Sequence, residues 1–545
     1  MTESAPPAPP PHSRRGAGLA AFAVCLGLAV GHTWPLATAP ATLSRHDNAD
    51  TTLNTWIVSW VAHQLPRDPR HLFDAPIFHP ERRTLAYSEP LIVPGAMAVP
   101  LRAAGLDATT TYNLLAILGY ALSAWAMWRL VEGWTGDAWA GAIAGAAYAF
   151  NAHLLTRFAH LQALHAEFLP LVLLAVDRLS RRAAWRDGWL LGSALALTGL
   201  TSIYQLAFAG GAAVIGLMAR AGEWRPRAAR TLGVAGMGLA AGGVLLAPVL
   251  WQYLAVSREL GMVRTLDAAA ASAATWRDYL ATAGRLHYAW WSAPLTTGTA
   301  LFPGVTVLAL AVVGLARGAD RRRVAMAAAI AALGLVMSLG PALPTYGWIY
   351  DLVPLLQATR VTSRWGVLVL TGLAMLAGLG VAALRRTAAP ARAVGLTALA
   401  LVTAEAWRAP MAFTPTPAIP AVYRWVARQE HAVLLELPVF PGGQFNLNAP
   451  YLLAQTVHFR PMVAGYSGLS SPAYDARLRS LSSFPSDAAH APLAALGVTH
   501  VVIHIPQLVD QYGAAAIDAL DRVPWLSREF DDGEARVFRV APIAP

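Results

Sequence analysis

Two aspartates stand directly after the first apolar stretch of the chain and offer carboxylates for chemistry. Asp47 and Asp50 are three residues apart. An ionised carboxylate can take the proton of a hydroxyl and act as a general base. Asp50 also lies where the N-cap of the next helix is expected, because Asp is a preferred N-cap residue, and Asp47 could shape a turn. The structural and the chemical role are compatible, and both remain open.

A helix is expected to follow Asp50. Apolar residues recur at the spacing of one helical face, namely Leu53, Trp56, Ile57, Trp60 and Val61. The segment is too short and too polar to cross a membrane, and it carries two tryptophans. The pattern therefore predicts a helix in the outer membrane interface, which would hold both aspartates at the membrane surface.

A second group of polar residues follows a later apolar stretch. Its members are Asn151, His153, Arg157, His160, Gln162, His165 and Glu167. Arg157 can bind a phosphate through charge-assisted hydrogen bonds, although an interfacial arginine also commonly snorkels to water. The histidine spacings of seven and five do not match the i, i+4 pair of a helical metal motif, so they disfavour zinc.

Two further sites carry charge on the same side. Glu89 can hold a metal or an acceptor, or it can cap a helix that begins near Pro90. Arg360 and Arg364 are four residues apart and lie on one helical face before an apolar stretch. They form a second candidate clamp for a phosphate or pyrophosphate.

The composition excludes a water-soluble enzyme. Of 545 residues, 56% are hydrophobic and 13% are charged, against roughly 45–50% and 25% in soluble domains. The net charge of +10 comes from the first 410 residues, where it reports membrane topology rather than nucleic-acid binding. Cys25 is the single cysteine, which excludes a disulfide framework.

About eleven apolar spans are expected, and arginines set their orientation. The spans lie near 17–38, 110–131, 138–156, 162–178, 188–202, 204–220, 231–250, 298–316, 324–340, 363–384 and 392–409. Alternate loops carry the arginines, in clusters at 178–186, 220–230, 317–323 and 385–392, as expected for cytoplasmic loops. The N-terminus is then cytoplasmic and everything after Pro410 is extracytoplasmic. A cleaved signal peptide is the alternative to an uncleaved first span.

The fold class is an α-helical polytopic membrane protein with a small extracytoplasmic α/β C-terminal domain. Residues 1–16 form a disordered tail, 17–410 the transmembrane domain with outer loops at 44–109, 251–297 and 341–362, and 411–545 the α/β domain. Within the last part, strands are expected at 431–439, 461–466, 498–505 and 535–540, with helices near 421–428, 473–481 and 508–520. The glycines between Gly233 and Gly242 lie inside an apolar span, so they predict close helix packing rather than a nucleotide site.

The chain resembles the GT-C superfamily of integral-membrane glycosyltransferases, in its bacterial, uncharacterised multispan branch related to protein mannosyltransferases. The resemblance rests on the acidic first loop, the helix after it, and the strings Leu72–Phe78 and Leu85–Glu89. It also rests on the group of Arg157, His160 and Gln162, on the Arg360 and Arg364 pair, and on the outer C-terminal region. The resemblance extends over most of the chain, and each of its motifs is short.

The resemblance implies transfer of a sugar from a polyprenyl-phosphate carrier to a glycan, lipid or protein acceptor, with inversion at the anomeric carbon. Such chemistry needs a base and cationic stabilisation of the leaving phosphate. Asp50 is the first choice for the base and Asp47 the second. Arg157, Arg360 and Arg364 would bind the donor phosphate, and Glu89, His160 and Gln162 would contact other parts of the substrates or a possible divalent metal. No other cofactor and no nucleic-acid partner is implied.

Three other functions compete with this hypothesis. A transporter usually carries ionisable residues near mid-bilayer, and the predicted spans have almost none there. A glycan polymerase would use a large outer loop on a different architecture, and the early acidic motif disfavours it. A non-catalytic scaffold is the third alternative, and activity of Asp47 and Asp50 variants separates it from an enzyme.

Overall fold

The computed structural model describes residues 11–261, 265–295, 298–352, 361–387 and 389–543. The chain divides into two compact units, each built from separate stretches of sequence. The first comprises Met1–Ala39, Leu114–Pro248 and Val263–Ala412, and the second comprises Pro40–Asn113, Val249–Met262 and Phe413–Pro545. The first outer loop of the sequence thus belongs to the same unit as the C-terminal region, although a long, mostly helical stretch of chain separates them.

Each of the eleven predicted apolar spans corresponds to one helix of the structure. They are α1 (Pro11–His32), α4 (Ala108–Thr135), α5 (Ala138–Ala149), α8 (Phe168–Arg181), α9 (Trp185–Thr201), α10 (Ile203–Ala219), α12 (Ala228–Glu259), α15 (Val305–Arg317), α16 (Arg321–Leu339), α18 (Gly366–Thr387) and α19 (Ala391–Ala406). Polar caps fix several starts, because the side chains of Asp137, Ser202 and Asp320 accept hydrogen bonds from the first free N–H groups of α5, α10 and α16. Ser202 also ends α9, so the chain breaks between α9 and α10 at this residue.

The protein is a membrane protein by the length and apolarity of its helices. Among the described residues, four helical stretches can cross a bilayer by these criteria: Ala108–Thr135, Ala221–Glu259, Arg321–Ala342 and Thr362–Thr387. Others are shorter; the 12 residues of α5 extend for about 18 Å, less than the roughly 30 Å of a hydrocarbon core.

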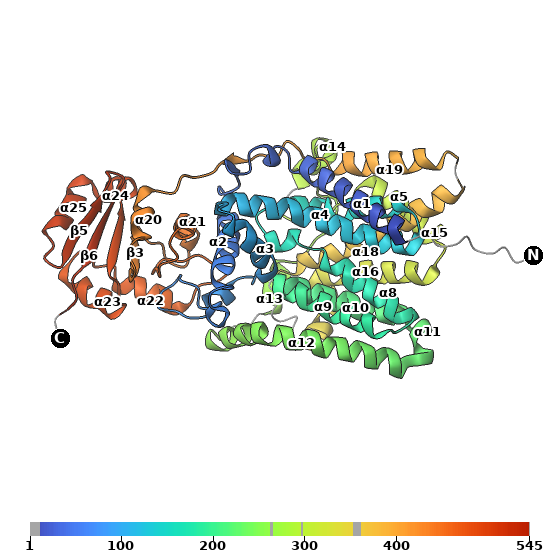
Figure 1. Ribbon diagram of the computed structural model, residues 1–545, viewed down its shortest axis with the longest axis horizontal. Helices are drawn as coiled ribbons and strands as arrows, with labels where there is room; N and C mark the ends of the chain where they lie inside the picture. Colours follow the sequence, from blue (N-terminus) through green and yellow to red (C-terminus); the bar gives the residue numbers. More distant parts are fainter. Residues whose placement is uncertain (1–10, 262–264, 296–297, 353–360, 388, 544–545) are drawn as a thin grey trace, which may run out of the picture. The chain divides into compact units, whose positions relative to one another are not determined.

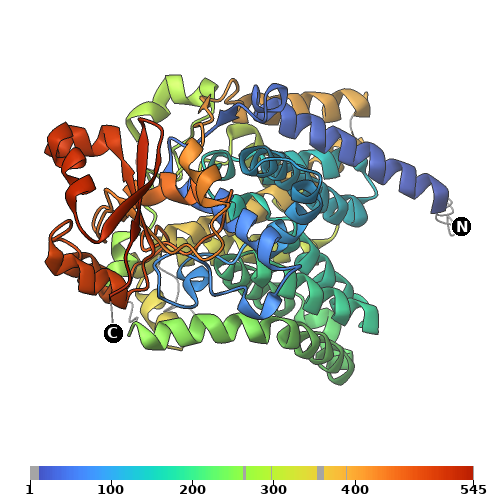
Figure 2. The same cartoon turned by 60° about the vertical axis from the view of Figure 1, so that its left-hand side comes forward.

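Helices α9 and α12 approach each other closely through glycine. A Cβ atom placed on Gly192 would lie 1.9 Å from the carbonyl oxygen of Gly238, and one on Gly238 would lie 1.8 Å from that of Gly188. A Cβ on Gly242 would likewise meet the backbone of Gly192 at 2.4 Å. Figures 1 and 2 both show the two green helices side by side. The prediction of small-residue packing in the Gly233–Gly242 segment is confirmed on this face.

The arginine-rich loops meet at one end of the first unit. Asp177 of α8 contacts Arg181, Arg220 and Arg323, which come from three of the four predicted cytoplasmic clusters. Arg385, from the fourth cluster, pairs with Asp137 just before α5. Figures 1 and 2 show that α1 also begins at the end where α11 (Ala221–Trp224) lies. These loops therefore share one side, as the alternation of arginines predicts.

In the second unit, helix α2 (Ala49–Gln64) is packed by protein on all sides. Residues 51–62 are all buried. The indole nitrogen of Trp56 donates to Gln455 Oε1 at 2.7 Å, and that of Trp60 donates to the carbonyl of Leu72 at 2.8 Å. The helix predicted after Asp50 is thus present, with both tryptophans bound by protein, and its place in the outer membrane interface stays a prediction. Helix α3 (Ile92–Ala103) packs on α2, and β1 (Leu43–Ser44) pairs antiparallel with β2 (Thr414–Pro415).

A four-stranded sheet with the order β3-β4-β6-β5 forms the C-terminal part of this unit. The strands are β3 (Leu434–Leu437), β4 (His500–His504), β5 (Leu526–Asp531) and β6 (Ala535–Val540). Neighbours β3 and β4 pair in parallel, whereas β6 pairs antiparallel with both β4 and β5. Val501, Ile503 and Phe538 lie in its core. Helices include α20 (Ala421–Val426), α21 (Ala449–Gln455), α22 (Pro472–Ser480) and α23 (His490–Ala495).

Three details differ from the predicted C-terminal elements. The expected strand at 461–466 forms only a bridge between Met462 and Leu434, whereas β5 was not expected. The expected helix at 508–520 is split into α24 (Ile505–Tyr512) and α25 (Ala514–Asp518). Gly513 lies between them with φ +79°, a conformation that glycine adopts readily and that interrupts a helix.

Candidate active-site residues

Asp50 is not the N-cap of helix α2. Asn48 is the N-cap of this helix, and its side-chain oxygen accepts a 2.9 Å hydrogen bond from the backbone N–H of Asp50. Asp50 is therefore the second helical residue and not the cap. The prediction that Asp50 caps the helix is therefore wrong. Its negative charge is still favoured in the first turn of a helix.

Tyr466 is one hydrogen-bond partner of Asp50. Its hydroxyl donates a 2.6 Å hydrogen bond to Asp50 Oδ1. Burial, followed by the hydrogen bond and charge of Asp50, raises the pKa of the Tyr466 phenol, so the phenol stays neutral and remains a donor. Phe445 packs edge-on against the Tyr466 ring at 5.1 Å. Tyr466 thus fixes the orientation of the Asp50 carboxylate.

Asp47 lies in a different environment. Its carboxylate is an exposed surface group that accepts a 3.0 Å hydrogen bond from Nε of Arg45, and the two side chains are 43% and 30% exposed. An exposed ion pair is screened by water and contributes little to orientation. Asp47 therefore lacks the positioning contact that Asp50 has.

His46 anchors the loop that carries both aspartates. Its Nδ1 lies 3.0 Å from Thr52 Oγ1 and its Nε2 lies 3.0 Å from Thr109 Oγ1. Burial lowers the pKa of His46 to about 4, although Asp47 and Asp107 act in the opposite direction. At neutral pH the imidazole is uncharged, and it ties the start of α2 to the start of α4.

Glu89 is not the N-cap residue of the helix that follows it. Leu91 is the N-cap of α3 and makes no side-chain cap hydrogen bond. Glu89 is half-buried and lies within electrostatic range of Tyr253, whose hydroxyl donates to the carbonyl of Ser88 at 2.5 Å. A substrate role for Glu89 stays a prediction.

The first unit gathers the predicted cationic group around one imidazole. Arg157 and His160 lie between two short helices, α6 (Ala152–Leu155) and α7 (Leu161–Leu164). Arg157, Arg364 and His160 all act electrostatically on the buried His153. Arg157 and Arg364, from distant parts of the sequence, therefore both lie within electrostatic range of the same imidazole.

Aromatic and amide contacts support this group. The Arg364 guanidinium lies over the Tyr204 ring, 4.8 Å from its centroid, which holds the cation by its interaction with the π-system. The Gln162 backbone carbonyl accepts from the side chain of Gln205. Arg360, the other half of the predicted clamp, lies outside the described residues.

Metal-ligating side chains were predicted near His160 and Glu89. Among the residues that the structure describes, no group of three or more His, Cys, Asp and Glu side chains could hold a metal ion. His165 contacts Glu167 Oε1 at 3.0 Å and the Leu115 carbonyl at 3.1 Å, so both of its nitrogens already have protein partners.

The sequence predicted Asp50 and the arginines as site residues, and this stays a prediction, but it gave no signal for Tyr466. The string Tyr466-Ser-Gly468 looks like an ordinary loop, and its partner is 416 residues away. Local spacing carries no signal for a contact of this kind.

Comparisons with known proteins show similarity of fold to solved structures. No protein-family model and no curated protein match the sequence. A mutant of the arabinofuranosyltransferase AftD from Mycobacteria has a TM-score of 0.58 and 19% identity, and the match covers 97% of this chain and 41% of AftD.

Two other solved structures are similar at lower scores. ArnT from Cupriavidus metallidurans, bound to undecaprenyl phosphate, has a TM-score of 0.48 and 13% identity over 97% of this chain and 98% of ArnT. The oligosaccharyltransferase AglB from Archaeoglobus fulgidus, in complex with an inhibitory peptide and a dolichol-phosphate, has a TM-score of 0.47 and 13% identity over 98% of this chain and 75% of AglB. The chain spans about four tenths of AftD, and over that length its fold is similar to the AftD fold.

Proposed function

We propose that the protein is a membrane glycosyltransferase that moves a sugar from a polyprenyl-phosphate carrier to an extracytoplasmic acceptor, with inversion and with Asp50 as the general base. The fold likeness to AftD supports the class of enzyme. The observation that carries the choice of base is the hydrogen bond from Tyr466 to Asp50, which holds a carboxylate that the helix does not use as a cap.

The chemistry follows from a carboxylate base. The Asp50 carboxylate takes the proton of the acceptor hydroxyl while the acceptor oxygen forms a bond to the anomeric carbon of the sugar. The bond from that carbon to the phosphate oxygen breaks, and polyprenyl phosphate leaves with the electron pair. Attack opposite the leaving group inverts the anomeric centre. Tyr466 is a positioning residue in this scheme.

Cations stabilise the leaving phosphate. Arg157 and Arg364 are proposed to donate charge-assisted hydrogen bonds to it, because guanidinium matches phosphate oxygens in geometry and charge. Their shared neighbour His153 supports a common role. His160, Gln162 and Glu89 are proposed to contact the sugar or the acceptor, and Arg360 would add to the clamp.

The proposed location is the inner (plasma) membrane, with the N-terminus in the cytoplasm and the C-terminal region outside it. The meeting of the arginine-rich loops supports a single charged side, which the positive-inside rule assigns to the cytoplasm. Cysteine labelling of intact cells and of inverted vesicles, with cysteines placed at Ser527 and at Arg186, would test this orientation.

The enzyme is tested with full-length protein in proteoliposomes. The donors are polyprenyl phosphates that carry either arabinofuranose or a hexose, and the products are polyprenyl phosphate and a glycosylated acceptor from an envelope extract. Release of polyprenyl phosphate only when acceptor is present supports transfer. A protein that moves the donor across the bilayer without cleaving it would be a transporter, and this result would reject the proposal.

A further inference from the structure

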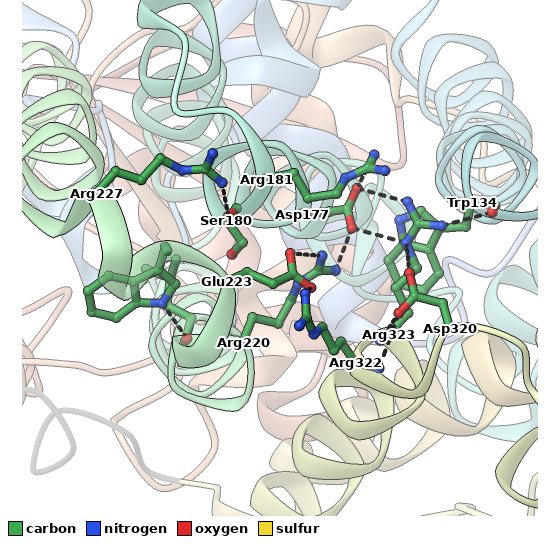
Figure 3. A network of polar contacts seen from close by, with 12 residues as sticks. Trp134, Asp177, Ser180, Arg181, Arg220, Glu223, Arg227, Asp320, Arg322 and Arg323 are labelled. Atoms are coloured by element: carbon green, nitrogen blue, oxygen red, sulfur yellow. Dashed lines mark hydrogen bonds and ion pairs between the residues drawn. The ribbon is translucent and has the colours of Figure 1, made fainter.

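A network of charged side chains lies at the arginine-rich end of the first unit (Figure 3). Asp177 is its centre. Its carboxylate accepts from Arg220 at 2.5 Å, from Arg323 at 3.1 Å and from Arg181 at 2.9 Å. Arg323 also donates to the carbonyl of Trp134 at 2.8 Å, so the network joins α4, α8, α16 and the end of α10.

The buried part of this network is internally paired. Asp177 is 0% exposed, Arg220 1% and Arg323 6%. Buried charges require partners, since desolvation of an unpaired ion is costly. Arg220 completes its pairing with Glu223 at 2.6 Å. The buried arginines thus form ion pairs with the buried acids.

An open cavity of about 810 Å³ adjoins the network. Four arginines and two acids line it, together with Gly222 and Ala319; the charged residues are Arg181, Arg227, Arg321, Arg322, Glu223 and Asp320. Its wall therefore carries an excess of positive charge.

Both acids on the cavity wall have other partners, so they do not fully neutralise the positive charge of the cavity arginines. Glu223 is bound to Arg220 and lies 3.5 Å from Arg322. Asp320 caps α16 by accepting from the backbone N–H groups of Arg322 and Arg323, at 3.1 and 3.2 Å.

The arginines themselves keep unused donors. The Arg322 side chain is 64% exposed and that of Arg181 is 50% exposed. Arg227 donates from Nη2 to the carbonyl of Ser180 at 2.9 Å, whereas its buried Nε has no hydrogen-bond partner among the described residues. These groups can serve an anion that enters the cavity.

We propose that this cavity binds a phosphate group, as carried by an anionic phospholipid headgroup at the arginine-rich membrane surface. Guanidinium groups recognise phosphate through paired charge-assisted hydrogen bonds. The cavity lies where α16 begins and α8 ends, hence at the level of lipid headgroups, and basic pockets between membrane helices are suited to such lipids. The site is separate from the residues of the proposed transfer chemistry.

Binding is measured on purified full-length protein in nanodiscs of phosphatidylcholine doped with phosphatidylglycerol or cardiolipin. The variants are R322Q and the double variant R227Q/R322Q. The control is R225Q, which removes an exposed arginine from the same loop but outside the cavity wall. We expect the double variant to lose about tenfold or more in anionic-lipid affinity and R225Q to match the wild type.

The outcomes separate the two sources of phosphate. Competition by anionic lipid but not by millimolar inorganic phosphate identifies a lipid site, and equal competition identifies a site for free phosphate. Equal lipid affinity in the wild type, R225Q and the cavity variants overturns the proposal. R322Q alone keeps the test decisive if the double variant fails to fold, because the Arg322 side chain is largely in solvent.

Discussion

The hydroxyl of Tyr466 donates a 2.6 Å hydrogen bond to Oδ1 of Asp50, which joins the start of α2 to a loop 416 residues further along the chain. Because Asn48 takes the capping role, this contact is a specific constraint on the Asp50 carboxylate. The proposed base is therefore oriented by a residue from the C-terminal region. Within the second unit, this gives the C-terminal region a direct part in the proposed chemistry.

Replacing Tyr466 by Phe should lower kcat about tenfold and leave KM for the lipid donor nearly unchanged. A hydrogen bond to a charged group contributes about 1.5–3 kcal/mol, and Y466F removes it while the ring contact with Phe445 remains. Steady-state kinetics in proteoliposomes provide the measurement. Y451F, which removes a hydroxyl bonded to the Pro438 carbonyl, is the control, and an equal loss in both variants would point to a general structural effect.

His46 should make stability depend on pH. Its pKa is about 4 in the folded protein and about 6.5 in the unfolded chain, so the unfolded state binds more protons between these values. The free energy of unfolding should therefore fall as pH is lowered from 6.5 to 4, by about 2 kcal/mol from this residue.

Thermal unfolding of the detergent-solubilised protein at pH 7 and pH 4.5 measures this effect. H46Q should show a smaller difference between the two midpoints than the wild type. H71Q is the control, because the His71 side chain is 65% exposed. If H46Q keeps the wild-type difference, His46 is not the source of the dependence.

Alanine substitutions should distinguish the packed face of the glycine-rich helix α12 from its open face. In G238A the new Cβ would meet a backbone oxygen at 1.8 Å, so α9 and α12 must move apart, and we expect a loss of about 1–3 kcal/mol or more. In G236A nothing lies within 4 Å, and the higher helix propensity of alanine should leave stability unchanged or raised. Thermal midpoints of the two proteins give the comparison, and equal midpoints would contradict the packing.

The buried carboxylate of Asp177 should be required for stability. D177N leaves the buried Arg220 and Arg323 short of negative charge, and loss of one partner of a buried pair costs about 3–5 kcal/mol. D267N changes an exposed aspartate of the same unit and should be neutral. A small effect of D177N in thermal unfolding would mean that Glu223 and water can take over its role.

The sequence predicted the helices well because their signal is local. Each long apolar run became a helix, and the arginines of alternate loops meet around Asp177. The surroundings of α2 could not be predicted in this way. Thr55 and Ser59 donate to carbonyls one turn earlier, which satisfies their hydroxyls and allows a face of polar composition to be buried.

The cap of α2 was misplaced for a related reason. Asn48 and Asp50 are both favoured N-cap residues, and hydrophobic periodicity defines a helix start only within a few residues. Tyr466 was missed because its contact depends on how the C-terminal region folds back on the first outer loop. Long-range contacts of this kind are not encoded in local spacing.

The most direct test compares D50N with D47N in the proteoliposome transfer assay. We expect D50N to lower the rate of sugar transfer by about 100-fold or more, in the range of a lost general base, while donor binding persists. D47N should stay within about threefold of the wild type. Transfer at the wild-type rate by D50N would contradict the assignment of Asp50 as the base.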